Sequence, residues 1–282
     1  MFENIAGIAL EASGSIVVAD PLMTALFRVD PLTGNRTVLS SSDVGAGPEF
    51  GGARCVAIGN TGSIFVTSLY QGKGAVFRVD PLTGNRTLIS SDSVGSGRMF
   101  EDVLGIALET NGDILVADPR MTSLFRVDPL SGDRTLLSVN GPGSGPEFVG
   151  HVRDVAVAAD GSIFVTDAAA VSGRVFEVDP LTGNRNLVSG PESGAGRLFE
   201  EVMGIAHTAT GDLLVADPHT TALFRIDALT GNRTILSSDS NGSGPNFWSA
   251  RYVEVVPVPE PATAAIWTVL ILTFVALYVR RR

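Results

Sequence analysis

Three histidines are the residues of this chain best suited to acid–base or metal-assisted chemistry: His151, His207 and His219. An imidazole titrates near neutral pH and also binds divalent metals. His207 stands where an equivalent segment carries the apolar Leu10, so it could face a central channel, and His219 follows Pro218 in a predicted loop. No Glu-His or His-x-His spacing accompanies them. We therefore regard His207 and His219 as weak catalytic candidates.

Aspartates recur at two fixed positions of a repeated segment. One set ends an apolar stretch: Asp20, Asp118, Asp167 and Asp217. A second set precedes a turn: Asp30, Asp80, Asp128, Asp179 and Asp227. Converging carboxylates can hold a hard cation, but an aspartate beside a turn also accepts backbone N–H groups. Because an active site should break the symmetry of a repeat, we predict that both sets cap turns and that no metal is bound.

An arginine also recurs in every repeated segment: Arg36, Arg86, Arg134, Arg185 and Arg233. These side chains could form a ring of positive charge, but their repetition favours a structural role. We predict that each arginine pairs with a neighbouring aspartate. The acidic, serine-rich loops at 40–47 and 237–242 lack the Asp/Asn spacing of a calcium loop, and we predict that they are flexible connectors.

The recurring residues belong to a repeat of about 50 residues. Its copies cover 2–49, 50–99, 100–147, 148–198 and 199–246, and a partial copy covers 247–256. The first copy predicts strands at 8–10, 16–18, 26–29 and 37–39. The unbroken apolar triplet Ile16-Val17-Val18 indicates a sheet that is covered on both faces. The run from Asp30 to Asn35 contains Pro31 and Gly34 and predicts a tight hairpin.

Four-stranded units of this length predict an all-β protein, a β-propeller of five four-stranded repeats over residues 1–256. The recurring Gly-Ile-Ala, Val-Ala-Asp and Leu-Phe-Arg-Val-Asp motifs resemble NHL-type and streptogramin-lyase-like propeller repeats. This resemblance implies the propeller fold from residue 2 to about 256. It also draws attention to His207 and His219, because virginiamycin-lyase-like propellers use a histidine-centred, metal-assisted site. No unique Glu, Asn and Asp trio matches the divalent-ion site of gluconolactonase-like propellers.

The leftover first strand at 252–256 leaves the number of blades open between five and six. Propellers often close by combining strands from both chain ends in one blade. We therefore expect an incomplete six-bladed ring whose first ~35 residues and signal peptide lie upstream of Met1. Residues 252–256 should then form a lone strand or dock against the first or last blade. The missing strands should leave a gap between the first and last blades, and the blade faces on either side of it should expose their apolar triplets.

Composition excludes several classes of partner and bond. The net charge of −10 argues against binding to nucleic acid or to anionic lipid. Cys55 is the only cysteine, so an intrachain disulfide is impossible, and its apolar neighbours predict a buried thiol. We predict no cofactor.

The C-terminal residues predict a membrane anchor. An uncharged, mostly apolar run from Ala262 to Val279 would form a helix of roughly 27 Å, enough to cross a bilayer core. A linker at 257–261 precedes the run, and Arg280, Arg281 and Arg282 follow it. Such a basic end stays in the cytoplasm. The sequence therefore predicts a single-pass protein whose residues before the anchor lie outside the cytoplasm.

The linker contains Pro259, Glu260 and Pro261. A Pro-Glu-Pro motif, a single membrane helix and a short basic tail together resemble the sorting signal of bacterial PEP-CTERM proteins. The resemblance implies export, anchoring in the bacterial inner membrane, and processing near the motif by an exosortase. Unlike that family, the chain begins within repeat sequence and shows no signal peptide, for which we expect a start codon further upstream.

Together these features favour an exported, non-catalytic propeller in the cell envelope, in the periplasm or outside the cell after processing. Its role would be to bind an extracellular ligand, with polysaccharide as one such class, or to contribute to the extracellular matrix. The alternative function is a metal-assisted lyase or lactonase.

Deletion of residues 262–282 tests the anchor. The truncated protein should be soluble, because no other stretch has 18 uncharged, mostly apolar residues. Sedimentation of membranes from expressing cells measures the outcome. A truncated protein that still sediments with membranes would show that another segment anchors it.

Overall fold

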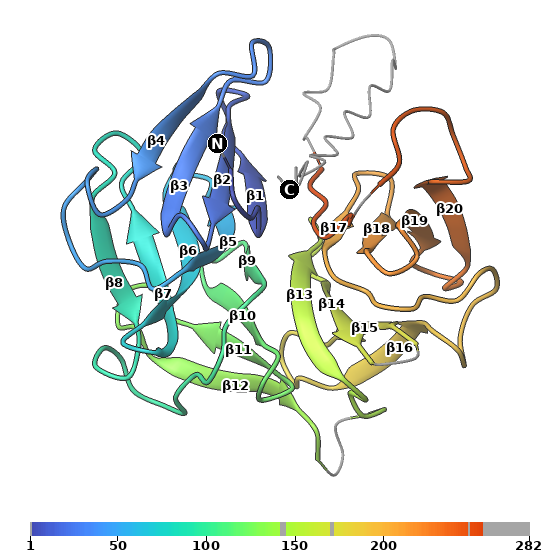
Figure 1. The fold of residues 1–282 in the computed structure, drawn as a ribbon. Helices are drawn as coiled ribbons and strands as arrows, with labels where there is room; N and C mark the ends of the chain where they lie inside the picture. Colours follow the sequence, from blue (N-terminus) through green and yellow to red (C-terminus); the bar gives the residue numbers. More distant parts are fainter. Residues whose placement is uncertain (1, 142–144, 170–171, 248, 256–282) are drawn as a thin grey trace, which may run out of the picture.

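The computed structural model describes residues 2–141, 145–169, 172–247 and 249–255. These residues form five antiparallel sheets of four strands, and they contain no helix. The sheets lie around a common centre as the blades of a five-bladed propeller, as predicted (Figure 1). Within the described part no helix is long and apolar enough to cross a membrane, and the predicted anchor at 262–279 lies outside that part.

Each blade adds its four strands in chain order from the centre outward. The inner strands are β1 (Gly7–Leu10), β5 (Ala53–Ile58), β9 (Ile106–Leu108), β13 (His151–Val157) and β17 (Ile205–His207). The second strands are β2 (Ile16–Asp20), β6 (Ile64–Tyr70), β10 (Ile114–Asp118), β14 (Ile163–Ala168) and β18 (Asp212–Asp217). The third strands are β3 (Ala25–Val29), β7 (Lys73–Val79), β11 (Ser123–Val127), β15 (Arg174–Val178) and β19 (Ala222–Asp227). The outer strands are β4 (Arg36–Ser40), β8 (Arg86–Ser90), β12 (Arg134–Val139), β16 (Arg185–Ser189) and β20 (Arg233–Ser238).

The apolar triplet of the second strand fills the space on both sides of its blade. Val17 packs into a cluster shared with the second blade, whereas Ile16 and Val18 pack on the other face with Phe27. All three triplet side chains are buried. Burial on both faces of β2 is the physical reason why the triplet lacks the in–out alternation of a half-exposed strand.

The hairpin between the third and outer strands has the predicted conformation. The Asp30 N–H donates to Asn35 O at 2.9 Å, and Gly34 takes a φ of 70°, a value that favours glycine. The Asp30 carboxylate accepts the N–H groups of Leu32 and Thr33, and these bonds hold the pKa of Asp30 below its ordinary value. The predicted role of this aspartate set as turn caps is confirmed.

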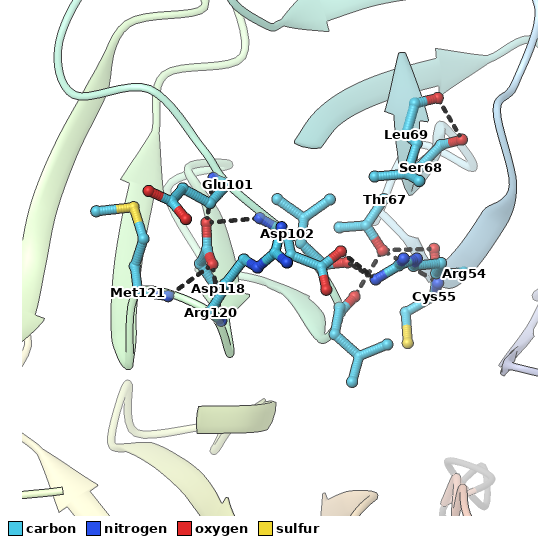
Figure 2. Close-up of polar contacts among 12 residues, drawn as sticks. Arg54, Cys55, Thr67, Ser68, Leu69, Glu101, Asp102, Asp118, Arg120 and Met121 are labelled. Atoms are coloured by element: carbon cyan, nitrogen blue, oxygen red, sulfur yellow. Dashed lines mark hydrogen bonds and ion pairs between the residues drawn. The ribbon is translucent and has the colours of Figure 1, made fainter. Parts of the chain in front are cut away.

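The second-strand aspartates also cap turns, and they hold an inter-blade loop as well. Asp118 is buried, and its carboxylate accepts the N–H groups of Glu101 and Asp102 before β9 and those of Arg120 and Met121 after β10, as Figure 2 shows. Burial raises the pKa of Asp118 although these bonds oppose the shift. Asp118 therefore joins the loop before the inner strand of its blade to the turn after the second strand.

The recurrent arginines do not pair with aspartates in the way we expected. The guanidinium group of Arg134 is buried and donates to the carbonyl oxygens of Ser91 (2.9 Å) and Val94 (3.0 Å) and to the Ser90 hydroxyl (2.7 Å). It also lies over the Phe100 ring, 5.4 Å from the centroid. Carbonyl dipoles and an aromatic face replace the expected carboxylate, because the loop from the preceding blade wraps around the guanidinium group.

This wrapping also corrects the prediction that the connector at 40–47 is flexible. In the first connector, Ser41 N–H donates to Val44 O at 2.9 Å, and Ala46 N–H donates to the Asn85 side chain of the next hairpin at 2.7 Å. A Cβ atom at Gly45 would lie 2.1 Å from the Gly84 carbonyl oxygen. The connector is therefore packed against the next blade through hydrogen bonds and close backbone contact.

Contacts between neighbouring inner strands run from β1 through β5, β9 and β13 to β17, whereas extensive contact between β1 and β17 is absent from the described part. Residues 249–255 lie beside β17 toward the centre of the ring (Figure 1). Gly204 N–H donates to Arg251 O at 2.7 Å, so the segment docks on the last blade as one of our alternatives predicted, although it forms no assigned strand. The expected exposure of apolar triplets on the two blade faces between β1 and β17 is wrong. Val18 of the first blade is fully buried, and Leu214, which lies on the face of the fifth blade away from the fourth, is only 6% exposed.

Replacement of Arg134 by methionine should destabilise the propeller by about 3 kcal/mol, because the buried carbonyl groups lose a charged donor and Phe100 loses its cation. Arg36→Met is the matched control, since exposed Arg36 has the equivalent position over Phe2. It should cost less than about 1 kcal/mol. Denaturant unfolding measures both, and equal losses would contradict the role assigned to Arg134.

Candidate functional site

A pocket of about 770 Å³ lies between the fourth and fifth blades, on the face of the ring where the inner strands begin. We call this side the pocket face. Its polar lining comes from the start of β13, the loop before β17 and the turn after β18, and comprises His151, Arg153, Glu200, Glu201 and His219. Its small and apolar lining comprises Val149, Gly150, Ala168 and Ala169.

His219 and Glu200 form the closest polar pair of this pocket. His219 Nδ1 lies 2.5 Å from Glu200 Oε2, and both side chains are open to solvent. The hydrogen bond to Glu200 raises the pKa of His219, with its negative charge as a further cause. Buried Asp217 positions both residues, because its carboxylate accepts their backbone N–H groups. The fold thus joins His219, one of the predicted candidates, to a carboxylate that can orient its ring.

The opposite wall contributes a second imidazole and a guanidinium group. His151 Nδ1 lies 2.7 Å from the carbonyl oxygen of Pro119 in the third blade. Arg153 lies 4.0 Å from Glu201, and its Nε atom has no hydrogen-bond partner among the described residues. The pocket therefore presents a cationic group, two carboxylates and two imidazoles, a set able to both donate and accept hydrogen bonds.

His207, the other candidate, does not belong to this pocket. It is the last residue of β17, at the end of the strand away from the pocket face, and its ring stacks on Phe164 at a centroid distance of 5.9 Å. Stacking on a buried aromatic ring accounts for this histidine without a catalytic role. Within the described ranges no group of three or more His, Cys, Asp or Glu side chains could hold a metal ion.

Other ionisable groups lie near the centre of the ring. The Asp154 carboxylate accepts the N–H of Ile205 at 3.1 Å, and its burial raises its pKa to about 7. Desolvation by the surrounding protein likewise raises the pKa of Glu254, in the segment beside β17, to about 7. Cys55 is buried as predicted; its thiol bonds to the Ala6 carbonyl oxygen, and burial raises its pKa. Figure 2 shows its neighbour Arg54, which is ion-paired with Asp102 at 2.5 Å.

Sequence reasoning named His151 without making it a catalytic candidate, and it missed Glu200 and Glu201. Glu200 and Glu201 do not depart from the repeat pattern, because the third blade has Glu101 and Asp102 at the equivalent positions. The only available signal was asymmetry: His219 stands where the first repeat has Leu22.

Comparison with known proteins supports the fold alone. No known protein family matches the chain, and no curated protein sequence matches it. Virginiamycin B lyase from Staphylococcus aureus is similar in structure, with a TM-score of 0.58, 15% identity, and coverage of 84% of this chain and 70% of the lyase. A gluconolactonase from Xanthomonas campestris gives a TM-score of 0.65, 15% identity, and coverage of 89% and 79%. A structure of the nidogen/laminin complex gives a TM-score of 0.63, 14% identity, and coverage of 83% and 78%.

These three similar structures are two enzymes and the nidogen/laminin complex. At such low identity they share a β-propeller with this chain, and activity does not follow from that likeness. The repeat resemblance to streptogramin-lyase-like propellers is thus supported at the level of the fold.

Replacement of Glu200 by glutamine should lower the pKa of His219 toward the ordinary histidine value, because the ring loses its main hydrogen-bond partner and a negative charge. The raised pKa means that the pair stabilises the fold at low pH and that this contribution is lost as pH rises through the pKa of His219. A titration of the His219 ring signals by NMR measures the shift. Glu201→Gln should shift the pKa of His219 less, since Glu201 acts only through its charge. A larger shift in Glu201→Gln than in Glu200→Gln would exclude the pairing of His219 with Glu200.

Proposed function

We propose that this protein is an exported, non-catalytic β-propeller that binds a polar, hydroxyl-rich ligand such as a polysaccharide in the pocket between the fourth and fifth blades. Residues 262–279 anchor it in the bacterial inner membrane, with Arg280, Arg281 and Arg282 in the cytoplasm and the propeller outside. Exosortase processing near Pro259, Glu260 and Pro261 then releases it. The pocket supports the binding role, and the composition of the tail supports the export route.

The size and lining of the pocket favour a ligand with many hydroxyl groups. A volume of about 770 Å³ lies within the range of ligand sites in proteins. Sugar hydroxyls both donate and accept, so carboxylates such as Glu201 and donors such as Arg153 can bind one ring from two sides. Charged partners also make stronger hydrogen bonds than neutral ones.

A binding role is favoured over catalysis by what the recurrent polar side chains already do. The buried aspartates and arginines form their hydrogen bonds with loops of the fold, as Asp217 and Arg134 illustrate. The polar residues left for a ligand lie on exposed pocket walls, where water screens their charges. A ligand there is held without the dry, pre-organised surroundings that strong electrostatic catalysis requires.

A lyase or lactonase remains the second candidate, because one observation favours it. A carboxylate that orients an imidazole, as Glu200 orients His219, is an arrangement that supports general base catalysis. A purified soluble form lacking 262–282 discriminates the two functions. A rise of several degrees in melting temperature with Mg²⁺ or Ca²⁺, together with turnover of a lactone or a cyclic ester, would favour the enzyme.

The pocket itself is tested by filling it. Ala169→Trp places a large ring in the pocket and should weaken binding to the cell's own exported polysaccharide at least about tenfold, because ligand and indole would overlap. Ala159→Trp is the matched control, since exposed Ala159 lies in the turn after β13, away from the pocket face. Affinity electrophoresis measures retardation of each variant in a gel that contains the polysaccharide. Equal retardation of the two variants would exclude this pocket, and recovery of shortened or unsaturated sugars would exclude a non-catalytic role.

A further inference from the structure

Five leucines are almost completely exposed, one at the tip of each hairpin between the third and outer strands. Their exposed fractions lie between 91% and 99%, for Leu32, Leu82, Leu130, Leu181 and Leu229. Every other large apolar side chain among the described residues is exposed by 64% or less. A single exposed leucine needs no explanation, but the same apolar residue at five equivalent tips forms an organised surface.

All five tips lie on one face of the ring. Each third strand begins at the pocket face, next to the end of the second strand, and ends at the opposite face, where its hairpin starts. We call this opposite side the hairpin face. Two of the hairpins are bonded to the preceding blade: Arg28 of the first blade donates to Pro81 O of the second hairpin at 2.9 Å, and Arg126 of the third blade donates to Pro180 O of the fourth at 2.8 Å.

The described chain also ends toward this face. The Cβ position of Gly204 lies nearest to Arg251 O, Tyr252 Cα and Val253 N, just as that of Gly7 lies nearest to Arg54 O, Cys55 Cα and Val56 N. Residues 251–255 therefore run alongside β17 as β5 runs alongside β1, from the pocket face to the hairpin face. Val255 occupies the place of Ile58, the last residue of β5.

Only six residues, 256–261, separate Val255 from the apolar run at 262–279. Six residues span at most about 20 Å when fully extended. A membrane that holds 262–279 must therefore lie close to the hairpin face, on which the five leucine tips are almost completely exposed.

We propose that the hairpin face docks on the lipid bilayer and that its five leucine tips insert into the interfacial region, an inference that rests on the proposed membrane anchor. The occupant is a lipid surface because the anchor enters it within six residues of the docked segment. Inserted leucines remove apolar surface from water, and five tips held by one rigid ring act together. Docking in this orientation directs the pocket away from the membrane.

The charge of the body determines which lipids suit this contact. The net charge is −10, and an ionised aspartate such as Asp80 lies beside each leucine. An anionic bilayer therefore repels the ring, whereas a zwitterionic bilayer does not. Apolar insertion consequently predicts that salt strengthens the contact with anionic lipid, the reverse of what a basic membrane-binding protein shows.

The full-length protein in phosphatidylcholine vesicles tests the proposal. Leu130→Cys carries an environment-sensitive dye at a tip, and Leu22→Cys carries it on the pocket face, where Leu22 is 64% exposed. The folded wild type controls for labelling of buried Cys55. Lipids with a nitroxide in the headgroup region should quench the dye at position 130 several-fold more than the dye at 22. In vesicles with added phosphatidylglycerol, quenching at 130 should rise as salt increases from about 0.05 M to about 0.5 M.

A variant with asparagine at the other four tips completes the test, since changes at such exposed positions leave the fold intact. It should float with the vesicles but lose most of the quenching at position 130. If the labelled proteins float and the two positions are quenched equally, the anchor stands and the docking is overturned. If they do not float, both the anchor and the docking are overturned. Disulfide crosslinks between copies of the unlabelled Leu130→Cys protein under mild oxidation, together with no lipid quenching of the labelled protein, would overturn the docking in favour of a second copy of the chain.

Discussion

The structure depends above all on a buried guanidinium group at the start of an outer strand. Arg86 shows the arrangement: it donates to the carbonyl oxygens of Ser41 and Val44, to the hydroxyl of Ser40, and lies over the ring of Phe50. These partners come from the preceding blade, the connector and the arginine's own blade. Burial lowers the pKa of Arg86 but leaves it charged, so removal of any partner would leave costly buried groups unsatisfied. A buried arginine of this kind thus fixes the position of a blade against the blade that precedes it.

The buried aspartates give the pocket face a similar rigidity. Asp217 holds the loop at Glu200 and the turn at His219, and Asp167 holds the loop at Gly150. The backbone around the pocket therefore repeats from blade to blade, whereas the side chains that line it do not. Exposed side chains on this repeated frame therefore set the chemistry of the pocket between the fourth and fifth blades, where His219 stands at the position that Leu22 has in the first blade.

The two faces of the ring consequently differ in kind. The pocket face carries ionisable side chains on short, capped loops. The hairpin face carries isolated leucines at the tips of turns, each beside a capping aspartate such as Asp30. The chain segment that follows the last blade runs from one face to the other through the centre, where Tyr252 and Glu254 lie close to Asp154. The fold therefore separates a polar face suited to a ligand from the side toward which the described chain ends.

The sequence by itself determined the repeat, the four strands of each blade and the turn chemistry. These follow from local rules: a doubly covered strand must be apolar throughout, and a tight hairpin requires residues such as Pro31 and Gly34. Only the tertiary structure decided the partners of the arginines, the packing of the connectors and the contact of His219 with Glu200. The residues that meet at the pocket are far apart in the chain, and a local sequence pattern does not indicate which residues of other strands or blades they contact. Asymmetry singled out His219 and His207 alike, and the fold placed one in a pocket and the other on an aromatic ring.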